Sequence, residues 1–311
     1  MARILVTGAA GFIGTGLCPA LAARGHDVVA GLRRPRQTPA DTEPRVLGAI
    51  GPGTDWSAAL RDIEVVIHLA QRAHAGPDAK TLAEEPEATA TLAHAAAAAG
   101  AKRLVLLSSI KAMGETTEPH RPFRFDHEPR PVDAYGRAKL ASETAASEAA
   151  RGAGLELVII RPPLVYGPGV KANFATLMRL AGSGLPLPFA AIDNCRSLIA
   201  RDNLVDLIAL AATHPAAAGQ ILLARDGFDL STPQLIEALA AGLGKRARLF
   251  PVPNMLFSAL RALPGIGLKM SSLTLSLQVD DSSTRTLMGW KFAVGVPFAL
   301  AETARAFAKR L

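Results

Sequence analysis

The chain has 311 residues, 49% of them hydrophobic, which is enough for a large buried core built as one α/β unit or as two lobes. Because there are only two cysteines (Cys18 and Cys195), no signal-peptide pattern and no run of about 18 apolar residues, we expect a reducing, cytoplasmic setting without a disulfide framework or a membrane span. A net charge of +7 indicates anionic partners. Only 5% of residues are aromatic and the basic residues are scattered, so phosphate-bearing small molecules are favoured over nucleic acid.

The first half of the chain alternates short apolar runs with helical patterns. Continuous apolar runs are typical of strands buried on both faces, and they occur at residues 3–8, 26–32, 64–70, 103–109 and 156–162. Each helix predicted between them is followed by a glycine that can end it. These helices span residues 12–24, 81–99 and 134–151. The alternation predicts an α/β fold with a doubly wound parallel sheet.

A glycine-rich turn lies between the first strand and the first helix. It reads "TGAAGFIG" (7–14), with its glycines spaced G-x-x-G-x-x-G. Glycines let the backbone approach a pyrophosphate, and the N-terminus of a helix offers free N–H groups and a partial positive charge. The strand–turn–helix setting therefore predicts the dinucleotide-binding loop of a Rossmann fold. The loop residues expected to contact the dinucleotide are Gly8, Gly11, Phe12, Ile13 and Gly14.

The end of the second strand bears on which dinucleotide is bound. An acidic residue there usually binds the ribose hydroxyls of NAD. This chain instead has Leu32, followed by Arg33 and Arg34. No carboxylate would repel a 2′-phosphate, and two guanidinium groups could bind it. The sequence therefore favours NADP as the cofactor, with NAD possible; a solvated basic loop is the interpretation that needs no ligand.

A tyrosine and a lysine lie four residues apart in the helix predicted at 134–151. Tyr135 and Lys139 would share one face of that helix, and Ser109 ends the fourth strand upstream. An unperturbed tyrosine has a pKa of about 10, and a neighbouring ammonium lowers that pKa by favouring the phenolate. These three residues are the predicted catalytic set, with Tyr135 as the proton donor.

The pattern changes after residue 166, where proline and glycine become more frequent. Residues 1–166 are predicted to form the dinucleotide-binding domain, and residues 167–311 mainly a smaller α/β lobe that binds the substrate. Residues 200–225 are expected to return to the first domain, with a short strand at 220–224 that joins its sheet.

Two helices of the second half have recognisable starts. Asp202 is the expected N-cap of a helix over 203–213. Thr232, followed by Pro233, is the expected N-cap of a helix over 233–242.

Together these motifs resemble the extended short-chain dehydrogenase/reductase family of nucleotide-sugar enzymes, also called the NAD-dependent epimerase/dehydratase family. The resemblance covers essentially the whole chain and includes the glycine loop, the Ser-Tyr-Lys set, "HLA" at 68–70 and "RPPLVYGPG" at 161–169. It implies that Ser109 holds the reacting sugar oxygen, that Tyr135 transfers its proton, and that Lys139 lowers the tyrosine pKa and binds the nicotinamide ribose. Further cofactor contacts that it implies are Leu69, Ala70, Pro162 and Val165.

The resemblance also bears on the adenine site and on assembly. Ala49, after the third strand, departs from the family, which often has an acidic residue near the adenine. A homodimer formed by a pair of helices is typical of the family, which implies a contact through 81–99 and 134–151.

Four shorter stretches look like a bacterial subgroup that reduces UDP-4-keto-6-deoxy-N-acetylglucosamine to UDP-N-acetylquinovosamine for surface polysaccharides. They are residues 68–74, 108–115, 166–174 and 186–199. The resemblance implies a UDP-sugar substrate, and cations beside a cleft suit its diphosphate. Ion pairs at the surface or between the lobes are the interpretation without a substrate. Besides Ser109, the candidate substrate contacts are Lys111, Asn173, Arg196 and Arg285.

The expected reaction is hydride transfer to C4 of the keto sugar, with Tyr135 donating a proton to the forming alkoxide. The alternative is a UDP-sugar 4-epimerase acting on UDP-glucose or UDP-N-acetylglucosamine, which oxidises and re-reduces C4 with the same residues. A 4,6-dehydratase is disfavoured, because Ile110 and Lys111 stand where that enzyme has Asp-Glu. A non-catalytic dinucleotide- or RNA-binding relative is disfavoured by the intact catalytic set.

Two histidines lie close to these motifs. His68 ends a strand and is predicted to be a packed, hydrogen-bonded structural residue, whereas His74 could reach the substrate. No cluster of His, Cys, Asp and Glu has metal-ligand spacing, so no metal site is predicted.

Overall fold

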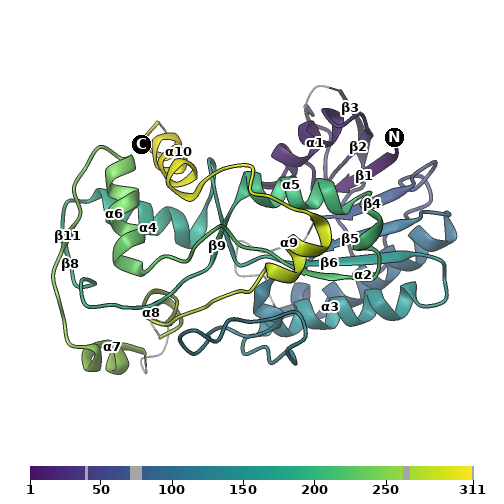
Figure 1. Cartoon of the computed structure of the whole chain (residues 1–311). Helices are drawn as coiled ribbons and strands as arrows, with labels where there is room; N and C mark the ends of the chain where they lie inside the picture. Colours follow the sequence, from purple (N-terminus) through teal and green to yellow (C-terminus); the bar gives the residue numbers. More distant parts are fainter. Residues whose placement is uncertain (39–40, 71–78, 262–266, 310–311) are drawn as a thin grey trace.

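The computed structural model describes residues 1–38, 41–70, 79–261 and 267–309. Its centre is a seven-stranded parallel sheet with the order β10-β6-β5-β4-β1-β2-β3 (Figure 1). The predicted doubly wound parallel sheet is confirmed. The strand order reverses beside β1, and such sheets bind ligands at the carboxyl ends of the strands at this point. The strands are β1 (Arg3–Thr7), β2 (Asp27–Leu32), β3 (Thr42–Val46), β4 (Val65–His68), β5 (Arg103–Leu107), β6 (Glu156–Arg161) and β10 (Ile221–Leu223).

Helices cover both faces of the sheet, which is why its strands are apolar throughout. Ile4 and Val6 of β1 belong to the core on the side of α1 and α5, and Leu5 belongs to the core on the side of α2 and α3. Figure 1 shows these two helix pairs on opposite sides of the sheet. The four helices are α1 (Gly14–Ala22), α5 (Arg201–Ala211), α2 (Ala79–Ala98) and α3 (Ala134–Ala150).

A second, mainly helical lobe follows the sheet. Its core lies between α4, α6 and α10, and two short parallel strand pairs, β7–β9 and β8–β11, flank it. Helix α9 lies against the sheet domain instead, through Met288. No helix in the part of the chain that the structure describes is long and apolar enough to cross a membrane. The remaining elements are β7 (Leu164–Tyr166), α4 (Ala172–Gly182), β8 (Pro186–Leu187), β9 (Leu198–Ala200), α6 (Thr232–Gly242), β11 (Arg248–Leu249), α7 (Asn254–Arg261), α8 (Gly267–Thr274), α9 (Ser282–Met288), α10 (Val296–Ala308) and the 3₁₀ turns η1 (Ile110–Ala112) and η2 (Pro215–Ala217).

The predicted glycine stops of the first three helices are confirmed. Gly25, Gly100 and Gly152 follow α1, α2 and α3 with φ values of 80°, 80° and 72°. This left-handed conformation is open to glycine at little cost and ends a helix.

Both predicted N-caps in the second half are wrong by one or two residues. Helix α5 begins at Arg201 after Ala200, so Asp202 lies inside its first turn. Helix α6 is capped by Ser231, whose Oγ accepts a hydrogen bond from the Gln234 N–H (3.3 Å) while the Gln234 side chain accepts one from the Ser231 N–H (2.8 Å). This reciprocal capping box fixes the start of the helix and makes Thr232 its first residue.

A buried ion pair fastens α3 to the sheet just below the candidate site. Arg161 at the end of β6 is 2% exposed, and its Nε donates to Glu143 Oε1 of α3 at 2.9 Å. Ser108, at the end of β5, also donates to Glu143. The carboxylate thus receives hydrogen bonds from two neighbouring strand ends, as a buried charge requires.

The Arg161→Met substitution is expected to lower the free energy of unfolding by about 3–5 kcal/mol, because it leaves the Glu143 charge buried without its partner. Urea denaturation measures this loss. The matched control is Arg130→Met, which breaks an ion pair to Glu128 whose side chains are 82% and 77% exposed, and which should change stability by less than about 1 kcal/mol. Equal losses in the two variants would contradict the proposed importance of the buried pair.

Candidate active site

The glycine loop after β1 is so compact that side chains would not fit at its key positions. Gly8 has φ of 71°, and its carbonyl accepts a hydrogen bond from the Gly11 N–H at 2.8 Å. A Cβ on Gly14 would lie 2.4 Å from the same carbonyl oxygen. The N-cap of α1, Ile13, makes no side-chain hydrogen bond, so no side chain caps the first N–H groups of the helix. The loop therefore fits the pyrophosphate of a dinucleotide.

A single hydroxyl fastens the segment opposite this loop. Thr7 Oγ1 accepts hydrogen bonds from the N–H groups of Leu69 and Ala70, at 3.2 Å each, and lies 2.9 Å from His68 Nδ1. Because two N–H groups already donate to this oxygen, its own proton points to Nδ1, which places the ring proton of His68 on Nε2. Burial, followed by the charge of Lys139, lowers the pKa of His68 to about 3. His68 is thus the neutral structural residue predicted from the sequence, and His74 lies outside the described residues.

The carboxyl ends of β2 and β3 carry the other predicted cofactor features. Leu32 is buried, whereas Arg33 and Arg34 are exposed at the start of the loop that follows. A hollow of about 440 Å³ after β3 is lined by residues between Leu47 and Asp55 and includes Ala49. The carboxyl ends of parallel strands share one edge of the sheet, so this hollow lies on the same edge as the glycine loop and suits the adenosine half of a dinucleotide.

Ser109 lies at the carboxyl end of β5, where it caps the turn η1. Its Oγ accepts a hydrogen bond from the Lys111 N–H at 3.2 Å, and the adjacent Ile110 N–H donates to the Pro162 carbonyl at 2.9 Å. The Ser109 hydroxyl also lies near the side chain of Tyr135, where it partly counters the larger effects of burial and Glu85 that raise the pKa of the phenol. The fold thus brings together the serine and the tyrosine that the sequence paired across two elements.

The Tyr135 side chain lies beside Lys139, but the lysine also has a carboxylate partner. Lys139 Nζ is 5.1 Å from the centre of the tyrosine ring, and its side chain is 1% exposed. The same Nζ lies 2.5 Å from Oε1 of Glu85 in α2. Burial first, and the charge of Glu85 second, raise the pKa of Tyr135 above its ordinary value. The expectation of a net lowering by Lys139 was therefore wrong, because Glu85 offsets the ammonium and the half-buried phenol is partly shielded from water.

Glu85 is the site residue that sequence reasoning missed. The signal was weak: an acidic residue just before Pro86 in an alanine-rich helix. Its partner is 54 residues away in the chain, so no local spacing could join them.

Lys111, a candidate substrate contact, braces the start of α3. Its Nζ bonds to Glu115 Oε1 at 2.9 Å and to Asp133 Oδ2 at 2.7 Å. Asp133 is the N-cap of α3 and accepts a hydrogen bond from the Gly136 N–H at 2.6 Å. Although burial would lower the pKa of Lys111, its bonds to Asp133 and Glu115 outweigh that effect and raise it. The lysine therefore remains charged and ties η1 to the turn of α3 that carries Tyr135.

The other three candidate substrate residues lie in different surroundings. Arg196 is half-buried, and its Nη1 donates to the Leu275 carbonyl at 3.2 Å. Desolvation lowers its pKa to about 10, although the charge of Glu115 acts to raise it. Because Glu115 also bonds to Lys111, both cations lie near the same carboxylate. Asn173 is exposed at the start of α4.

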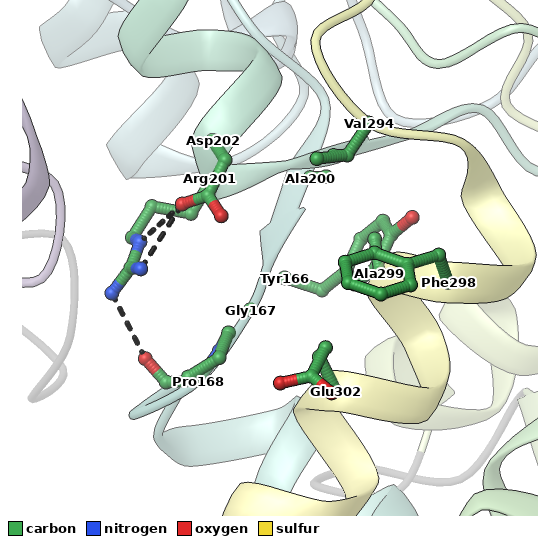
Figure 2. A pocket seen from close by; sticks show the side chains of 10 residues that line it. All are labelled: Tyr166, Gly167, Pro168, Ala200, Arg201, Asp202, Val294, Phe298, Ala299 and Glu302. Atoms are coloured by element: carbon green, nitrogen blue, oxygen red, sulfur yellow. Dashed lines mark hydrogen bonds and ion pairs between the residues drawn. The ribbon is translucent and has the colours of Figure 1, made fainter.

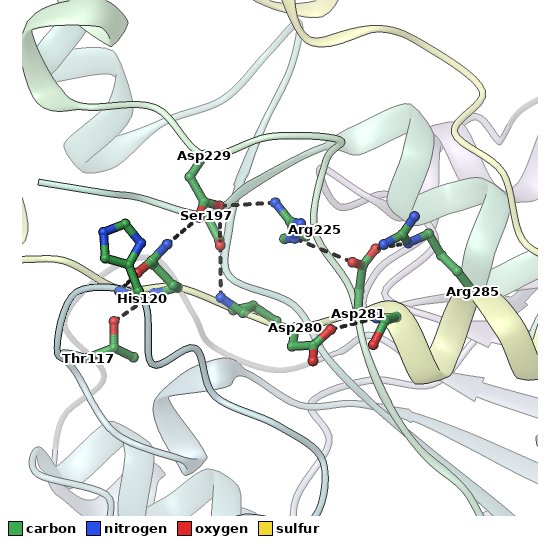
Figure 3. A network of polar contacts seen from close by, with 11 residues as sticks. Thr117, His120, Ser197, Arg225, Asp229, Asp280, Asp281 and Arg285 are labelled. Carbon is green, nitrogen blue, oxygen red and sulfur yellow. Dashed lines mark hydrogen bonds and ion pairs between the residues drawn. The ribbon is translucent and has the colours of Figure 1, made fainter.

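Arg285 is held within an ion-pair cluster (Figure 3). Its Nε lies 3.1 Å from Oδ2 of the completely buried Asp281, and its guanidinium lies 5.8 Å from the ring centre of Phe292. Arg225 approaches the other oxygen of Asp281 at 3.3 Å. The cluster joins the end of β10 to α9, so the structure gives Arg285 a structural partner.

The expected cofactor contact Val165 lies where the cores of the two lobes meet, since the next residue, Tyr166, belongs to the core of the second lobe. The ring of Phe12 in the glycine loop packs against the core of the second lobe and lies 5.8 Å from the Arg201 guanidinium, and Val165 packs against the core of the sheet domain. A cavity of about 120 Å³ lies nearby between β7, β9 and α10 (Figure 2). Neither Tyr135 nor Lys139 lines it, so this cavity is separate from the catalytic set.

The fold and the site together define the class of protein. The chain combines a doubly wound parallel sheet, a dinucleotide-type glycine loop and a Ser-Tyr-Lys set formed by the end of β5 and helix α3. This combination is typical of a nicotinamide-dependent enzyme. The sequence profile of the NAD dependent epimerase/dehydratase family matches residues 4–223. The chain belongs to this family, as its motifs indicated.

Several relatives match the chain along almost its whole length. It is 40% identical to a UDP-glucose 4-epimerase of Vibrio cholerae, over 98% of this chain and 95% of that protein. It is 33% identical to a 3-diazoavenalumate denitrifying reductase of a Streptomyces species, over 93% and 95%. A solved structure of MoeE5 in complex with UDP-glucose and NAD aligns with a TM-score of 0.78 and 26% identity, covering 99% of each chain. Epimerases and reductases thus both occur among its relatives.

The Gly14→Ala substitution should weaken NADH binding about tenfold or more, because a Cβ against the Gly8 carbonyl overpacks the loop at a cost of about 1–3 kcal/mol. Titration followed by NADH fluorescence measures the affinity. The control is Gly295→Ala, where φ is −79° and no atom lies within 4 Å of the added Cβ. Undiminished NADH binding by Gly14→Ala would contradict the assignment of the loop.

Proposed function

We propose that the protein is a UDP-sugar 4-epimerase of the UDP-glucose type. The observation that carries the proposal is its 40% identity with the Vibrio cholerae UDP-glucose 4-epimerase over 98% of this chain, together with an assembled Ser109, Tyr135 and Lys139. In this reaction C4 of the sugar is oxidised to a ketone and then reduced from the opposite face. One acid–base residue next to C4 serves both steps.

Different residues of the chain would bind the sugar, transfer the proton and hold the cofactor in this reaction. The Ser109 hydroxyl, which lies near Tyr135, would hold the C4 oxygen of the sugar beside the phenol. Tyr135 would accept the hydroxyl proton during oxidation and return it during reduction. The glycine loop, Leu69, Ala70, Lys139 and the segment from Pro162 to Val165 would hold the dinucleotide. When bound, that cofactor supplies the hydride acceptor and donor.

Elimination chemistry is disfavoured by the residues that follow Ser109. A 4,6-dehydratase needs further acid–base groups there, whereas Ile110 is 3% exposed and Lys111 is a cation held between two carboxylates. Neither side chain could remove a proton from the sugar ring. This supports a reaction confined to C4.

The second candidate function is the NADPH-dependent reduction of UDP-4-keto-6-deoxy-N-acetylglucosamine. Arg33 and Arg34 favour it, because they are exposed directly after the buried Leu32 and could bind a 2′-phosphate. A reductase needs an exchangeable NADPH, whereas an epimerase retains its dinucleotide between the two half-reactions.

Parallel assays separate the two candidates. We expect interconversion of UDP-glucose and UDP-galactose without added reductant, and Tyr135→Phe should lower this rate roughly a hundredfold or more by removing the acid–base group. Stoichiometric loss of NADPH with UDP-4-keto-6-deoxy-N-acetylglucosamine, and no interconversion of UDP-hexoses, would overturn the epimerase in favour of the reductase. Turnover of neither substrate would contradict both proposals.

The Arg33→Ala/Arg34→Ala double variant tests the cofactor preference. If the arginines bind a 2′-phosphate, NADPH affinity should fall about tenfold or more, since a charge-assisted hydrogen bond contributes about 1.5–3 kcal/mol, while NADH affinity should hardly change. Fluorescence titrations with both cofactors measure this, and Arg36→Ala, an exposed position in the same loop, is the control. Equal effects on NADH and NADPH would contradict a preference for NADP.

A further inference from the structure

The interface of α2 and α3 holds a buried acid–base pair behind the catalytic tyrosine. Glu85 of α2 is 9% exposed and Lys139 of α3 is 1% exposed, with 2.5 Å between Oε1 and Nζ. Two groups this deeply buried interact strongly, because little water screens them. The ammonium is also the cation that lies 5.1 Å from the ring centre of Tyr135.

We propose that Glu85 is a positioning residue of this active site: its carboxylate holds Lys139 and offsets the lysine charge, and thereby governs how readily Tyr135 releases its proton. The inference rests on the proposed function only in assigning proton transfer to Tyr135. It holds for an epimerase and for a reductase alike, since both use the same phenol.

The other charges around the tyrosine and the lysine do not replace Glu85. Within the described part of the chain, the ionisable groups that act on Tyr135 or Lys139 come from α2, from α3 and its N-cap, and from β4; they include Glu85, Glu143, Asp133 and His68. His68 is neutral, because burial lowers its pKa to about 3. It therefore adds no charge at neutral pH.

The remaining carboxylates have cations of their own. Glu143 bonds to Arg161, and Asp133 bonds to Lys111. Glu85 has its described ion pair with Lys139. The three carboxylates are thus matched to three different cations, and Glu85 is the one matched to the lysine beside the phenol.

This arrangement has a chemical consequence for the direction of proton transfer. A free ammonium beside the phenol would favour the phenolate, which is the base needed to oxidise an alcohol. With the ammonium offset by Glu85, Tyr135 keeps its proton more firmly. A phenol that holds its proton more firmly is a weaker acid, and its phenolate is a stronger base, so Glu85 sets the balance between removing the proton of the C4 hydroxyl and returning it to the C4 alkoxide.

The Glu85→Gln substitution tests the proposal directly, because it keeps the shape and a hydrogen-bond acceptor but removes the charge. The chain has two tyrosines, and the other, Tyr166, is completely buried and donates to Asp226. The near-ultraviolet absorbance of the phenolate, taken as the difference from the matched Tyr135→Phe variant, therefore reports Tyr135 alone. We expect Glu85→Gln to lower the titration midpoint of Tyr135 by about one pH unit or more, the effect of a charge at this range.

Two further variants control for structure. Glu85→Asp keeps the negative charge and should keep a raised midpoint, which separates charge from mere disturbance of the helix. Glu87→Gln removes a charge from an exposed position two residues further along the same helix and should leave the midpoint unchanged. An unchanged midpoint in a folded Glu85→Gln variant, or an equal shift in Glu87→Gln, would overturn the proposal.

The unmodified protein provides a test that does not depend on a folded variant at position 85. Measured against Tyr135→Phe, its Tyr135 phenolate should appear only above the ordinary tyrosine pKa of about 10. Titration below that value would mean that the ammonium is not offset, and would overturn the role of Glu85. Because these titrations need no sugar, they stand or fall separately from the epimerase assay.

Discussion

The placement of α3 depends on ion pairs made with three different parts of the protein. Asp133 at its N-cap pairs with Lys111 of η1, Lys139 pairs with Glu85 of α2, and Glu143 pairs with Arg161 of β6. Each pair joins α3 to an element that carries or supports the site. The Lys139–Glu85 and Glu143–Arg161 pairs are shielded from water and therefore depend strongly on geometry, which leaves the helix little freedom to turn or slide. The ring of Tyr135 is therefore held beside Lys139.

The sequence was informative wherever the physical signal was local. Apolar runs predicted the strands, the glycines of residues 7–14 predicted the compact loop, and the four-residue spacing of Tyr135 and Lys139 placed them on one helix face. Two predictions from the sequence were wrong, one for a local reason and one because of a distant residue. Thr232 was a reasonable N-cap until the reciprocal bonds of its neighbour Ser231 with Gln234 were known. The proton affinity of Tyr135 could not be judged, because Glu85 reaches Lys139 from another helix.

Lys111 shows how a structural residue can occupy a position where another side chain could take part in the reaction. Lys111 lies two residues after Ser109, in the turn that follows β5. A carboxylate there could act as a base, whereas the ammonium of Lys111 is held by Glu115 and Asp133. The lysine cannot act as a base, but it bonds to Asp133 and thereby holds the N-cap of α3 in place. Relatives with the same fold can therefore differ in reaction without differing in architecture.

The edge strand β3 has a bearing on how copies of this chain could associate. Pro44 lies in the middle of β3 and lacks the N–H that a further strand would need, and Glu43 pairs with Arg45 beside it at 2.6 Å. At the opposite edge, β10 is only three residues long. A proline, charged side chains and a short edge strand are features that keep sheets from pairing edge to edge. The two edges of the sheet therefore disfavour a continuous sheet between copies of this chain.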